Sequence, residues 1–299
     1  LPLHHAFAFT TNLLLPILAG ARITMAENIR TVARDMQETG PTVLIAVPLM
    51  LEKMHARMQD GIQESKVANL LMKVGLKRAV ANRIRKKLGG QIRMIVTGGA
   101  ACDAALIKGL DRMGLPVIEG YGLTETGPVL AINPPGKARA GSVGKALPGV
   151  ELKIVDPNND GVGEIAVRGQ NIMKGYFNNP EASAECMRDG WFLTGDLGML
   201  DSKEYLTITG RKKNVIVNRE GKNIYPQEIE NEVCRSKFIR EAIVLPYSDA
   251  DNPVGEKPAI IVVPDAQAIN EHAEHKGKTL SQSDIDQFVR DEVKSTTRR

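Results

Sequence analysis

Short apolar runs alternate with helical patterns between residue 22 and about residue 120. The strands predicted from β-branched and aliphatic runs are residues 22–25, 42–47, 92–97 and 115–118. The helices predicted between them are residues 29–38, a segment after Pro48, a basic stretch before residue 92, and residues 103–113. Leu51, Met54 and Met58 recur on one face of the second helix, so we expect them in the core. This alternation is typical of a parallel α/β sheet, which is the predicted fold class.

The pattern changes after about residue 138. Short strands predict a β-rich subdomain over residues 139–211, and the turn at residues 157–161 separates two of them. From residue 212 onward, strands and helices predict a small, mobile α+β domain that extends to residue 299. Within it, the polar residues 266–283 are expected to form a surface loop before a helix that starts near Asp284. The large domain is therefore predicted as residues 1–211 and the small domain as residues 212–299.

Composition narrows the class of protein. The 299 residues are 42% hydrophobic and 25% charged, the ordinary balance of a globular enzyme, and the net charge of +4 does not indicate a nucleic-acid partner. The three cysteines lie far apart, which favours a reducing, cytoplasmic setting without disulfides. No apolar run reaches the ~20 residues that span a bilayer. The longest, residues 13–21, is expected to be a buried helix, and because the chain starts at Leu1 we expect both of its ends to be cuts.

Positive charge is concentrated before the third predicted strand. Between Ser65 and Cys102 there are no acidic residues and nine basic ones: Lys66, Lys73, Lys77, Arg78, Arg83, Arg85, Lys86, Lys87 and Arg93. One interpretation is a solvated helix face. The other is a surface for anionic lipid head groups, or for the phosphates of a nucleotide-bearing thiol, which would give peripheral membrane contact through residues 66–93.

The segment most informative about chemistry is residues 119–128, which read Glu-Gly-Tyr-Gly-Leu-Thr-Glu-Thr-Gly-Pro after a short buried strand. In α/β sheets, ligands bind at the carboxyl ends of strands. The glycines leave room for a ligand near the backbone, the two threonine hydroxyls can bond phosphate, and the Glu125 carboxylate can hold Mg²⁺. A Gly/Thr loop of this kind could also be only a turn.

This string resembles the central motif of the adenylate-forming (ANL) superfamily of AMP-binding enzymes, which includes acyl-CoA synthetases, peptide-synthetase adenylation domains and beetle luciferases. The resemblance implies that Thr124 contacts the α-phosphate of ATP and that Glu125 binds Mg²⁺. It also implies that Tyr121 stacks on adenine and that Gly122 lies at the nucleotide.

Further segments resemble the family's other motifs, in the family's order. Residues 1–7 resemble the family's Leu-Pro-Leu-Phe-His segment, which implies that His5 lines the acyl pocket, although His4 stands where the family usually has an aromatic residue. Gly98, Gly99 and Ala100 resemble the turn that contacts adenine.

Residues 190–198 and 210–230 complete the set of motifs. The resemblance implies that Asp196 accepts hydrogen bonds from the ribose hydroxyls and that Arg211 contacts the ribose and phosphate side. It implies that Lys213 is the hinge of the small domain and that Gly221 lets the pantetheine arm of coenzyme A pass. The string at 210–230 and the basic stretch look most like long-chain fatty acyl-CoA synthetases.

The implied reaction is an ATP-dependent ligation with ATP, Mg²⁺ and coenzyme A, in which a fatty acid becomes acyl-AMP and then acyl-CoA. The family's phosphate loop and C-terminal lysine have no counterpart in this sequence, so we expect this chain alone to be inactive and its parent to be active. Two alternatives stay open: an acyl-AMP ligase or adenylation domain that delivers to a carrier protein, and a non-catalytic nucleotide- or acyl-binding protein. Residues 141–146 lack phosphate-loop spacing, and His272 with His275 is expected to be a surface pair rather than a zinc site.

Overall fold

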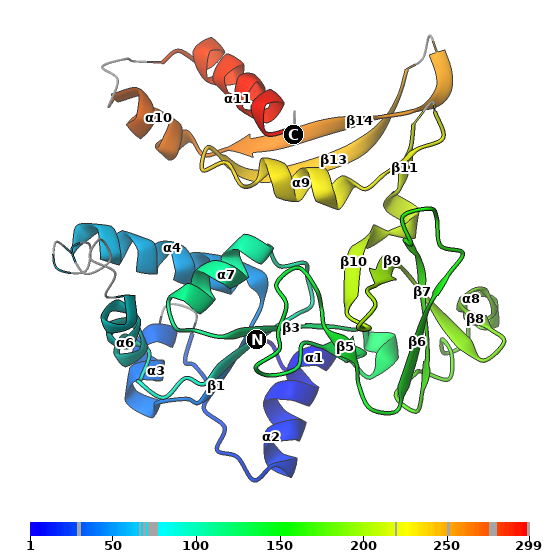
Figure 1. Cartoon of the computed structure of the whole chain (residues 1–299), viewed down its shortest axis with the longest axis horizontal. Coiled ribbons are helices and arrows are strands. Elements are labelled where there is room, and N and C mark those ends of the chain that lie inside the picture. Colours follow the sequence, from blue (N-terminus) through cyan, green and yellow to red (C-terminus); the bar gives the residue numbers. More distant parts are fainter. Residues whose placement is uncertain are drawn as a thin grey trace. The chain divides into compact units, whose positions relative to one another are not determined.

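The computed structural model describes residues 1–28, 31–65, 67, 70, 77–218, 220–249, 252–274 and 280–297, and it divides into two compact units (Figure 1). Unit 1 comprises Leu1–Val155, Ile165–Thr194 and Met199–Ile208, and unit 2 comprises Asp156–Glu164, Gly195–Gly198 and Thr209–Arg299. The predicted domain boundary at residues 211 and 212 stays a prediction. Three residues named above, Lys66, Lys73 and His275, lie outside the described residues, as do residues 29 and 30, where a predicted helix begins.

The first sheet of unit 1 confirms the predicted parallel α/β core. Strands β1 (Val43–Ala46), β2 (Met94–Thr97) and β3 (Val117–Tyr121) pair in parallel, in that order. Two short antiparallel strands, β4 (Ala131–Ile132) and β5 (Lys145–Ala146), extend the sheet beyond β3. The strand predicted at residues 22–25 is wrong, because that segment is irregular and forms no ladder with any described strand. A β-branched run becomes a strand only when a neighbouring strand pairs with its backbone.

Helices cover this sheet and fill its core. They are α3 (Val32–Thr39), α4 (Pro48–Glu64), α6 (Lys77–Lys87) and α7 (Ala104–Arg112). Leu51 and Leu110 are fully buried with Ile95 of β2, and Met54 and Met58 pack against the same cluster. The methionine stripe is therefore core packing, as predicted. Asp103 caps α7, because its Oδ1 accepts a hydrogen bond from the backbone N–H of Ala105 at 2.8 Å.

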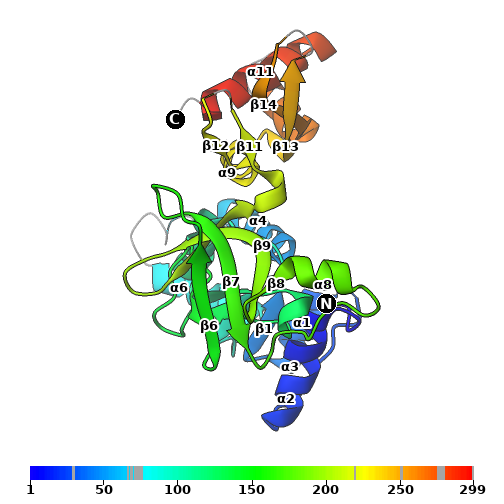
Figure 2. The same ribbon diagram turned by 90° about the vertical axis from the view of Figure 1, so that its right-hand side faces the viewer.

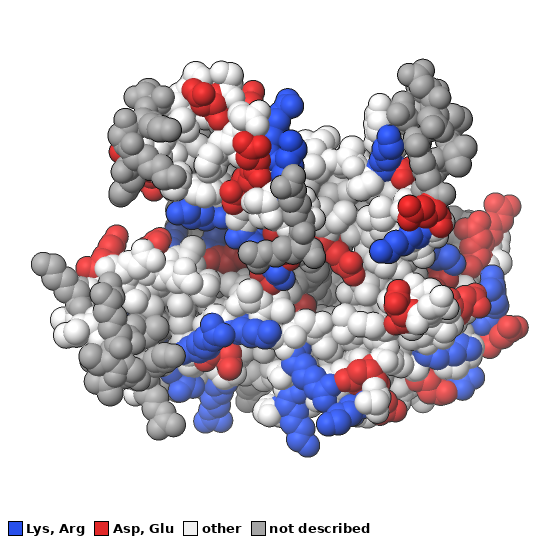
Figure 3. All heavy atoms as spheres, turned by 45° about the horizontal axis from the view of Figure 1, so that its top comes forward, with Lys and Arg blue, Asp and Glu red and all other residues white. Residues whose placement is uncertain are grey.

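Helix α6 carries part of the basic stretch as an amphipathic helix. Val80, Ile84 and Leu88 (which follows the helix) are buried, whereas Arg83 and the Lys86–Lys87 pair are exposed. This arrangement supports the interpretation as a solvated helix face. On the face drawn in Figure 3, positive and negative side chains are interspersed with uncharged ones. Membrane contact through residues 66–93 stays a prediction, and none of the described helices has the length and apolar character needed to cross a bilayer.

The chain begins with three consecutive helical segments, α1 (Ala6–Phe9), the π-helical turn η1 (Thr10–Leu14) and α2 (Leu15–Leu18). The helix expected at residues 13–21 is present, but its predicted burial is wrong, because Leu15 is 57% and Leu18 85% exposed. Apolar composition distinguishes this segment from a polar one, but burial depends on whether another element packs against it.

The second sheet corresponds to the predicted β-rich region. Its strand order is β10 (Leu206–Arg211), β9 (Trp191–Leu200), β7 (Gly163–Gly169) and β6 (Val150–Val155), and Figure 2 shows the last three side by side. The short strand β8 (Met187–Arg188) pairs with β9 after helix α8 (Pro180–Cys186). Leu130, Ile165, Phe192 and Leu206 are buried together and form the core of this region.

The C-terminal part of unit 2 is α+β, as predicted. A small hairpin of β11 (Ile216–Val217) and β12 (Asn223–Ile224) precedes α9 (Pro226–Val233), and a long hairpin joins β13 (Ile239–Asp249) to β14 (Asn252–Pro264). Two helices follow, α10 (Ala266–Glu274) and α11 (Gln282–Thr297).

The surface loop expected at residues 266–283 is wrong over its first half, which is helix α10. Ile269 and Ala273 are buried and lie four residues apart, which is helical spacing. Most other residues of the segment are polar, so two apolar positions were too few to predict a helix. His272 is half-buried rather than fully exposed. Its ring lies 5.1 Å from that of Phe238, centroid to centroid, so it contacts an aromatic residue of the small core of this unit.

Candidate functional site

The motif loop leaves the sheet at the carboxyl end of β3 and makes one turn of 3₁₀ helix, η2 (Thr124–Thr126). Gly122 is required there by close backbone approach. A Cβ at this position would lie 2.1 Å from the carbonyl oxygen of Pro128 and 2.8 Å from Cα of Val129. The loop is therefore folded back on itself, with Thr124 exposed at its tip.

The two threonines of the loop have different roles. Thr126 is fully buried, and its hydroxyl donates to the carbonyl of Leu123 at 2.9 Å while accepting from the N–H of Leu123 at 2.8 Å. The expectation that both threonine hydroxyls can bond phosphate is therefore wrong for Thr126, because its hydroxyl closes the turn. Thr124 keeps its side chain at the surface.

Glu125 is held by a segment about fifty residues further along the chain. Its backbone carbonyl accepts from the N–H of Met173 at 2.8 Å, and its Oε1 accepts from the hydroxyl of Tyr176 at 2.9 Å. Among the described residues, the other carboxylate oxygen, Oε2, has no hydrogen-bond partner. Magnesium in nucleotide sites is often held by one or two carboxylates together with substrate phosphates, so a single free carboxylate oxygen fits Mg²⁺.

The Gly98–Gly99–Ala100 turn follows β2, the strand beside β3. A Cβ on Gly98 would lie 2.9 Å from the carbonyl oxygen of Gly120, so only glycine lets the turn pack against the start of the motif loop. The same position lies close to the ring of Phe7. The structure thus brings together three segments that the sequence analysis named separately: residues 1–7, the turn and the motif loop.

A buried polar group lies directly beneath these loops. Glu119 is 5% exposed and in register with Thr97, and its Oε1 accepts from the backbone N–H of Cys102 at 3.3 Å. Burial raises the pKa of Glu119 from its ordinary value of 4.5 to about 7. Burial, followed by the charge of Glu119, raises the pKa of the Cys102 thiol to about 12, so this cysteine is unreactive. Sequence reasoning named Glu119 only as the first residue of the motif string.

In unit 2, the structure brings Asp196 and Arg211 together. Asp196 is buried on β9, and its Oδ1 lies 2.7 Å from Nε of Arg211, whose side chain is 57% exposed. Lys213 follows in the exposed 3₁₀ turn η3 (Lys212–Asn214), beside Lys212, which pairs with Glu164 at 2.7 Å. The pair can present a carboxylate and a guanidinium to one polar ligand.

Gly221 closes the turn of the β11–β12 hairpin. It has a φ of +75°, its N–H donates to the carbonyl of Asn218 at 3.0 Å, and no heavy atom lies within 4 Å of where a Cβ would be. The backbone is therefore open on that side. His5 is the N-cap residue of α1, exposed, with its ring 5.1 Å from that of His4.

Sequence reasoning missed the segment that supports Glu125. Asn171 donates from Nδ2 to the carbonyls of Thr126 and Val129 at 2.8 and 3.1 Å, in addition to the contacts of Met173 and Tyr176. The one signal in the sequence is Gly175-Tyr176-Phe177 after a predicted strand, and an exposed aromatic pair does not by itself indicate a partner.

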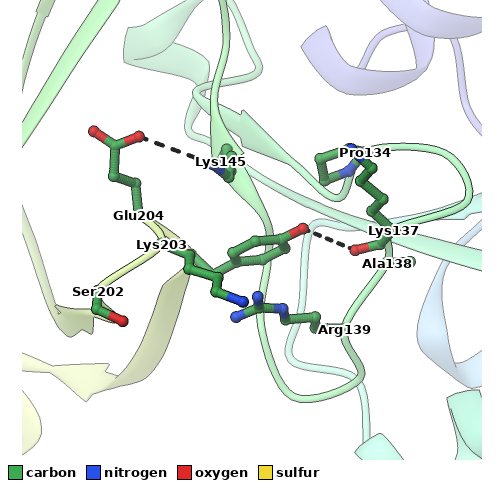
Figure 4. Close-up of a pocket in the computed structure, with 9 residues that line it drawn as sticks. Pro134, Lys137, Ala138, Arg139, Lys145, Ser202, Lys203 and Glu204 are labelled. Carbon is green, nitrogen blue, oxygen red and sulfur yellow. Dashed lines mark hydrogen bonds and ion pairs between the residues drawn. The ribbon is translucent and has the colours of Figure 1, made fainter.

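A separate cavity of about 900 Å³ lies in unit 1, and none of the predicted site residues lines it (Figure 4). Its charged lining consists of Lys137, Arg139, Lys145, Lys203 and Glu204. The guanidinium of Arg139 lies 3.6 Å from the centre of the Tyr205 ring, and the Tyr205 hydroxyl donates to the carbonyl of Lys137 at 2.9 Å. Arg139 also pairs with Asp201. At least one cation of the cavity lining, Arg139, is therefore already engaged in contacts within the protein.

The fold and these motif loops define the class of adenylate-forming enzymes. O-succinylbenzoate coenzyme A synthetase from Bacillus subtilis, in complex with ATP and magnesium ion, matches 95% of this chain and 55% of its own, with a TM-score of 0.70 and 27% identity. The family model described as AMP-binding enzyme matches residues 1–177. The chain belongs to this family.

Two relatives of this chain are named for different acids. A long-chain-fatty-acid–CoA ligase, FadD15, from Mycobacterium bovis is 39% identical over 206 residues, which are 69% of this chain and 32% of the relative. Indoleacetate–CoA ligase from Aromatoleum aromaticum is also 39% identical, over 214 residues, 69% of this chain and 41% of the relative. The chain therefore spans less than half of the length of these two relatives.

Proposed function

We propose that the protein is an acid–CoA ligase that uses ATP to convert a long-chain fatty acid into acyl-CoA. The observation that supports this most strongly is the loop after β3: its backbone folds back, Thr124 is exposed, and the Oε2 of Glu125 has no partner among the described residues. The Gly98 turn packs against Gly120 at the start of this loop. The names of two relatives that ligate acids to CoA support the same class of reaction.

Each predicted residue keeps its role within this proposal. Gly98, Gly99 and Ala100 would contact the adenine, Tyr121 would stack on it, and Gly122 would lie at the nucleotide. Thr124 would bond the α-phosphate, Asp196 the ribose hydroxyls, and Arg211 the ribose and phosphate side. The side chain of His5 would line the acyl pocket.

Glu125 would hold Mg²⁺, which when bound neutralises charge on the ATP phosphates. Little covalent chemistry is then required of the protein, because positioning and charge stabilisation dominate phosphoryl and adenylyl transfer.

The reaction divides into two displacements. In the first, an oxygen of the fatty carboxylate attacks the α-phosphorus of ATP, and the bond to pyrophosphate breaks. In the second, the thiol of coenzyme A loses its proton and attacks the acyl carbon, and the bond to AMP breaks. Lys213 is proposed as the hinge between these steps, and Gly221 as the place where the pantetheine arm passes, because the backbone is open there.

The proposal is more specific about the acid than about the class of reaction, because it names a fatty acid as the substrate. An aromatic acid is the alternative, because indoleacetate–CoA ligase is as similar to this chain as the fatty-acid ligase is. In the test, the protein expressed from its complete reading frame is incubated with ATP, Mg²⁺, coenzyme A and one acid at a time. The acids are a series of fatty acids and indoleacetate, and the AMP and the thioester formed are quantified in each reaction.

Equal amounts of AMP and a fatty acyl thioester are expected. If only indoleacetate gives a thioester, the fatty-acid assignment is wrong, but the assignment as an acid–CoA ligase stands. Adenylate without thioester would instead indicate delivery to a carrier protein. No turnover with any acid would favour a non-catalytic binding protein.

A further inference from the structure

Hydrogen bonds and backbone contacts that do not involve the Tyr176 side chain hold residues 169–177 against the motif loop. The Asn171 amide donates to two backbone carbonyls of the loop, and the N–H of Met173 donates to the carbonyl of Glu125. A Cβ on Gly127 would lie 2.9 Å from the carbonyl oxygen of Asn171, so the two backbones are in direct contact. The segment is therefore held in place before any side chain reaches the Glu125 carboxylate.

The backbone of Tyr176 is anchored independently as well. Its N–H donates to Oγ of Ser183 at 2.8 Å, and that hydroxyl donates to the carbonyl of Asn179 at 2.8 Å, in the first turn of α8. The Tyr176 residue is 40% exposed, so its ring contributes little to the core. Its hydroxyl then makes one specific contact, the 2.9 Å hydrogen bond to Oε1 of Glu125.

The chemistry of the two groups sets the direction of this hydrogen bond. The phenol of Tyr176 carries the proton and donates it, and the carboxylate oxygen of Glu125 accepts. A hydrogen bond to Oε1 restricts the orientation of the carboxylate. The other oxygen, Oε2, has no hydrogen-bond partner among the described residues.

We propose that Tyr176 is a positioning residue that holds the Glu125 carboxylate so that Oε2 is presented to the nucleotide-bound Mg²⁺. This proposal rests on the proposed function, which assigns the metal to Glu125. Carboxylates that bind metals are themselves held by hydrogen bonds, and removing such an outer partner typically lowers metal affinity or activity about 10–100-fold. Because Tyr176 is partly exposed, we expect the lower end of that range.

The test compares Tyr176→Phe with the wild type in the complete enzyme. Initial rates at saturating ATP, acid and coenzyme A are measured as a function of free Mg²⁺. The Mg²⁺ concentration for half-maximal rate should rise about tenfold in the variant. The rate at saturating Mg²⁺ and the thermal unfolding temperature should stay close to the wild type, because the segment keeps its backbone contacts. Tyr247→Phe is the matched control, because Tyr247 is 53% exposed on β13, and it should leave the Mg²⁺ dependence unchanged.

A parallel Glu125→Gln variant separates failure of this inference from failure of the proposed function. If Glu125→Gln raises the Mg²⁺ requirement but Tyr176→Phe does not, the positioning role of Tyr176 is refuted and the metal assignment stands. If neither variant changes the Mg²⁺ requirement, the metal assignment of Glu125 is wrong, and the inference is refuted with it. A lower unfolding temperature with an unchanged Mg²⁺ requirement would show that Tyr176 acts only through structure.

Discussion

Glu119→Gln should stabilise unit 1 at alkaline pH relative to the wild type. Glu119 is buried in the middle of β3, and in the folded state its carboxyl has a pKa of about 7 instead of 4.5. The wild-type stability associated with the neutral carboxyl is fully present below 4.5 and is lost as the pH rises through about 7. Glutamine cannot ionise, so the variant does not lose it. Its amide oxygen can still accept from the N–H of Cys102.

The magnitude follows from the two pKa values. A rise from 4.5 to about 7 corresponds to about 3 kcal/mol of unfolding free energy, of which about 2.5 kcal/mol falls between about pH 5 and about pH 8. Near pH 5 the folded wild type carries a neutral carboxyl, so the two proteins should differ little. Near pH 8 the variant should be more stable by most of that amount.

The assay is urea unfolding at both pH values, followed by the fluorescence of Trp191. Trp191 is the only tryptophan of the chain and belongs to unit 1, as Glu119 does. Glu151→Gln is the control, because Glu151 is exposed and its pKa is lowered by a hydrogen bond from Arg168, so this variant should gain nothing at alkaline pH. An equal difference between Glu119→Gln and wild type at both pH values would refute the reasoning, as would a loss of stability near pH 8.

Three further outcomes are expected. Gly122→Ala should destabilise unit 1 by about 1–3 kcal/mol in urea unfolding, because the Cβ of the alanine would overlap the backbone of Pro128. An unfolding midpoint equal to that of the wild type would contradict the folded-back loop. Asp196→Ala in the complete enzyme should weaken ATP binding at least about tenfold by calorimetry, because hydrogen bonds to a charged group contribute roughly 1.5–3 kcal/mol each; unchanged affinity would remove Asp196 from the site. Leu206→Ala should cost about 2–5 kcal/mol in unfolding free energy, because the side chain is fully buried; a loss below about 1 kcal/mol would mean that the core collapses around it.

The sequence by itself predicted the parallel strands of the first sheet, the β-rich region that follows them, and the family. Strands β1, β2 and β3, helix α7, and the short strands of the second sheet follow local patterns, because the hydrophobic period and the turn residues can be read from neighbouring positions. The motif loop was recognisable for the same reason, since its residues are contiguous. The segment at residues 22–25 and helix α10 were misread because pairing partners and burial lie elsewhere in the chain.

Only the tertiary structure decided what the side chains of the motif loop do. The hydroxyl of Thr126 closes a turn while that of Thr124 is exposed, although the two residues look alike in the sequence. Tyr176 meets Glu125 across 51 positions of the chain. Burial of Glu119, and hence its raised pKa, depends on every element that surrounds it. Such contacts follow from the path of the whole chain through space, which no local pattern of residues specifies.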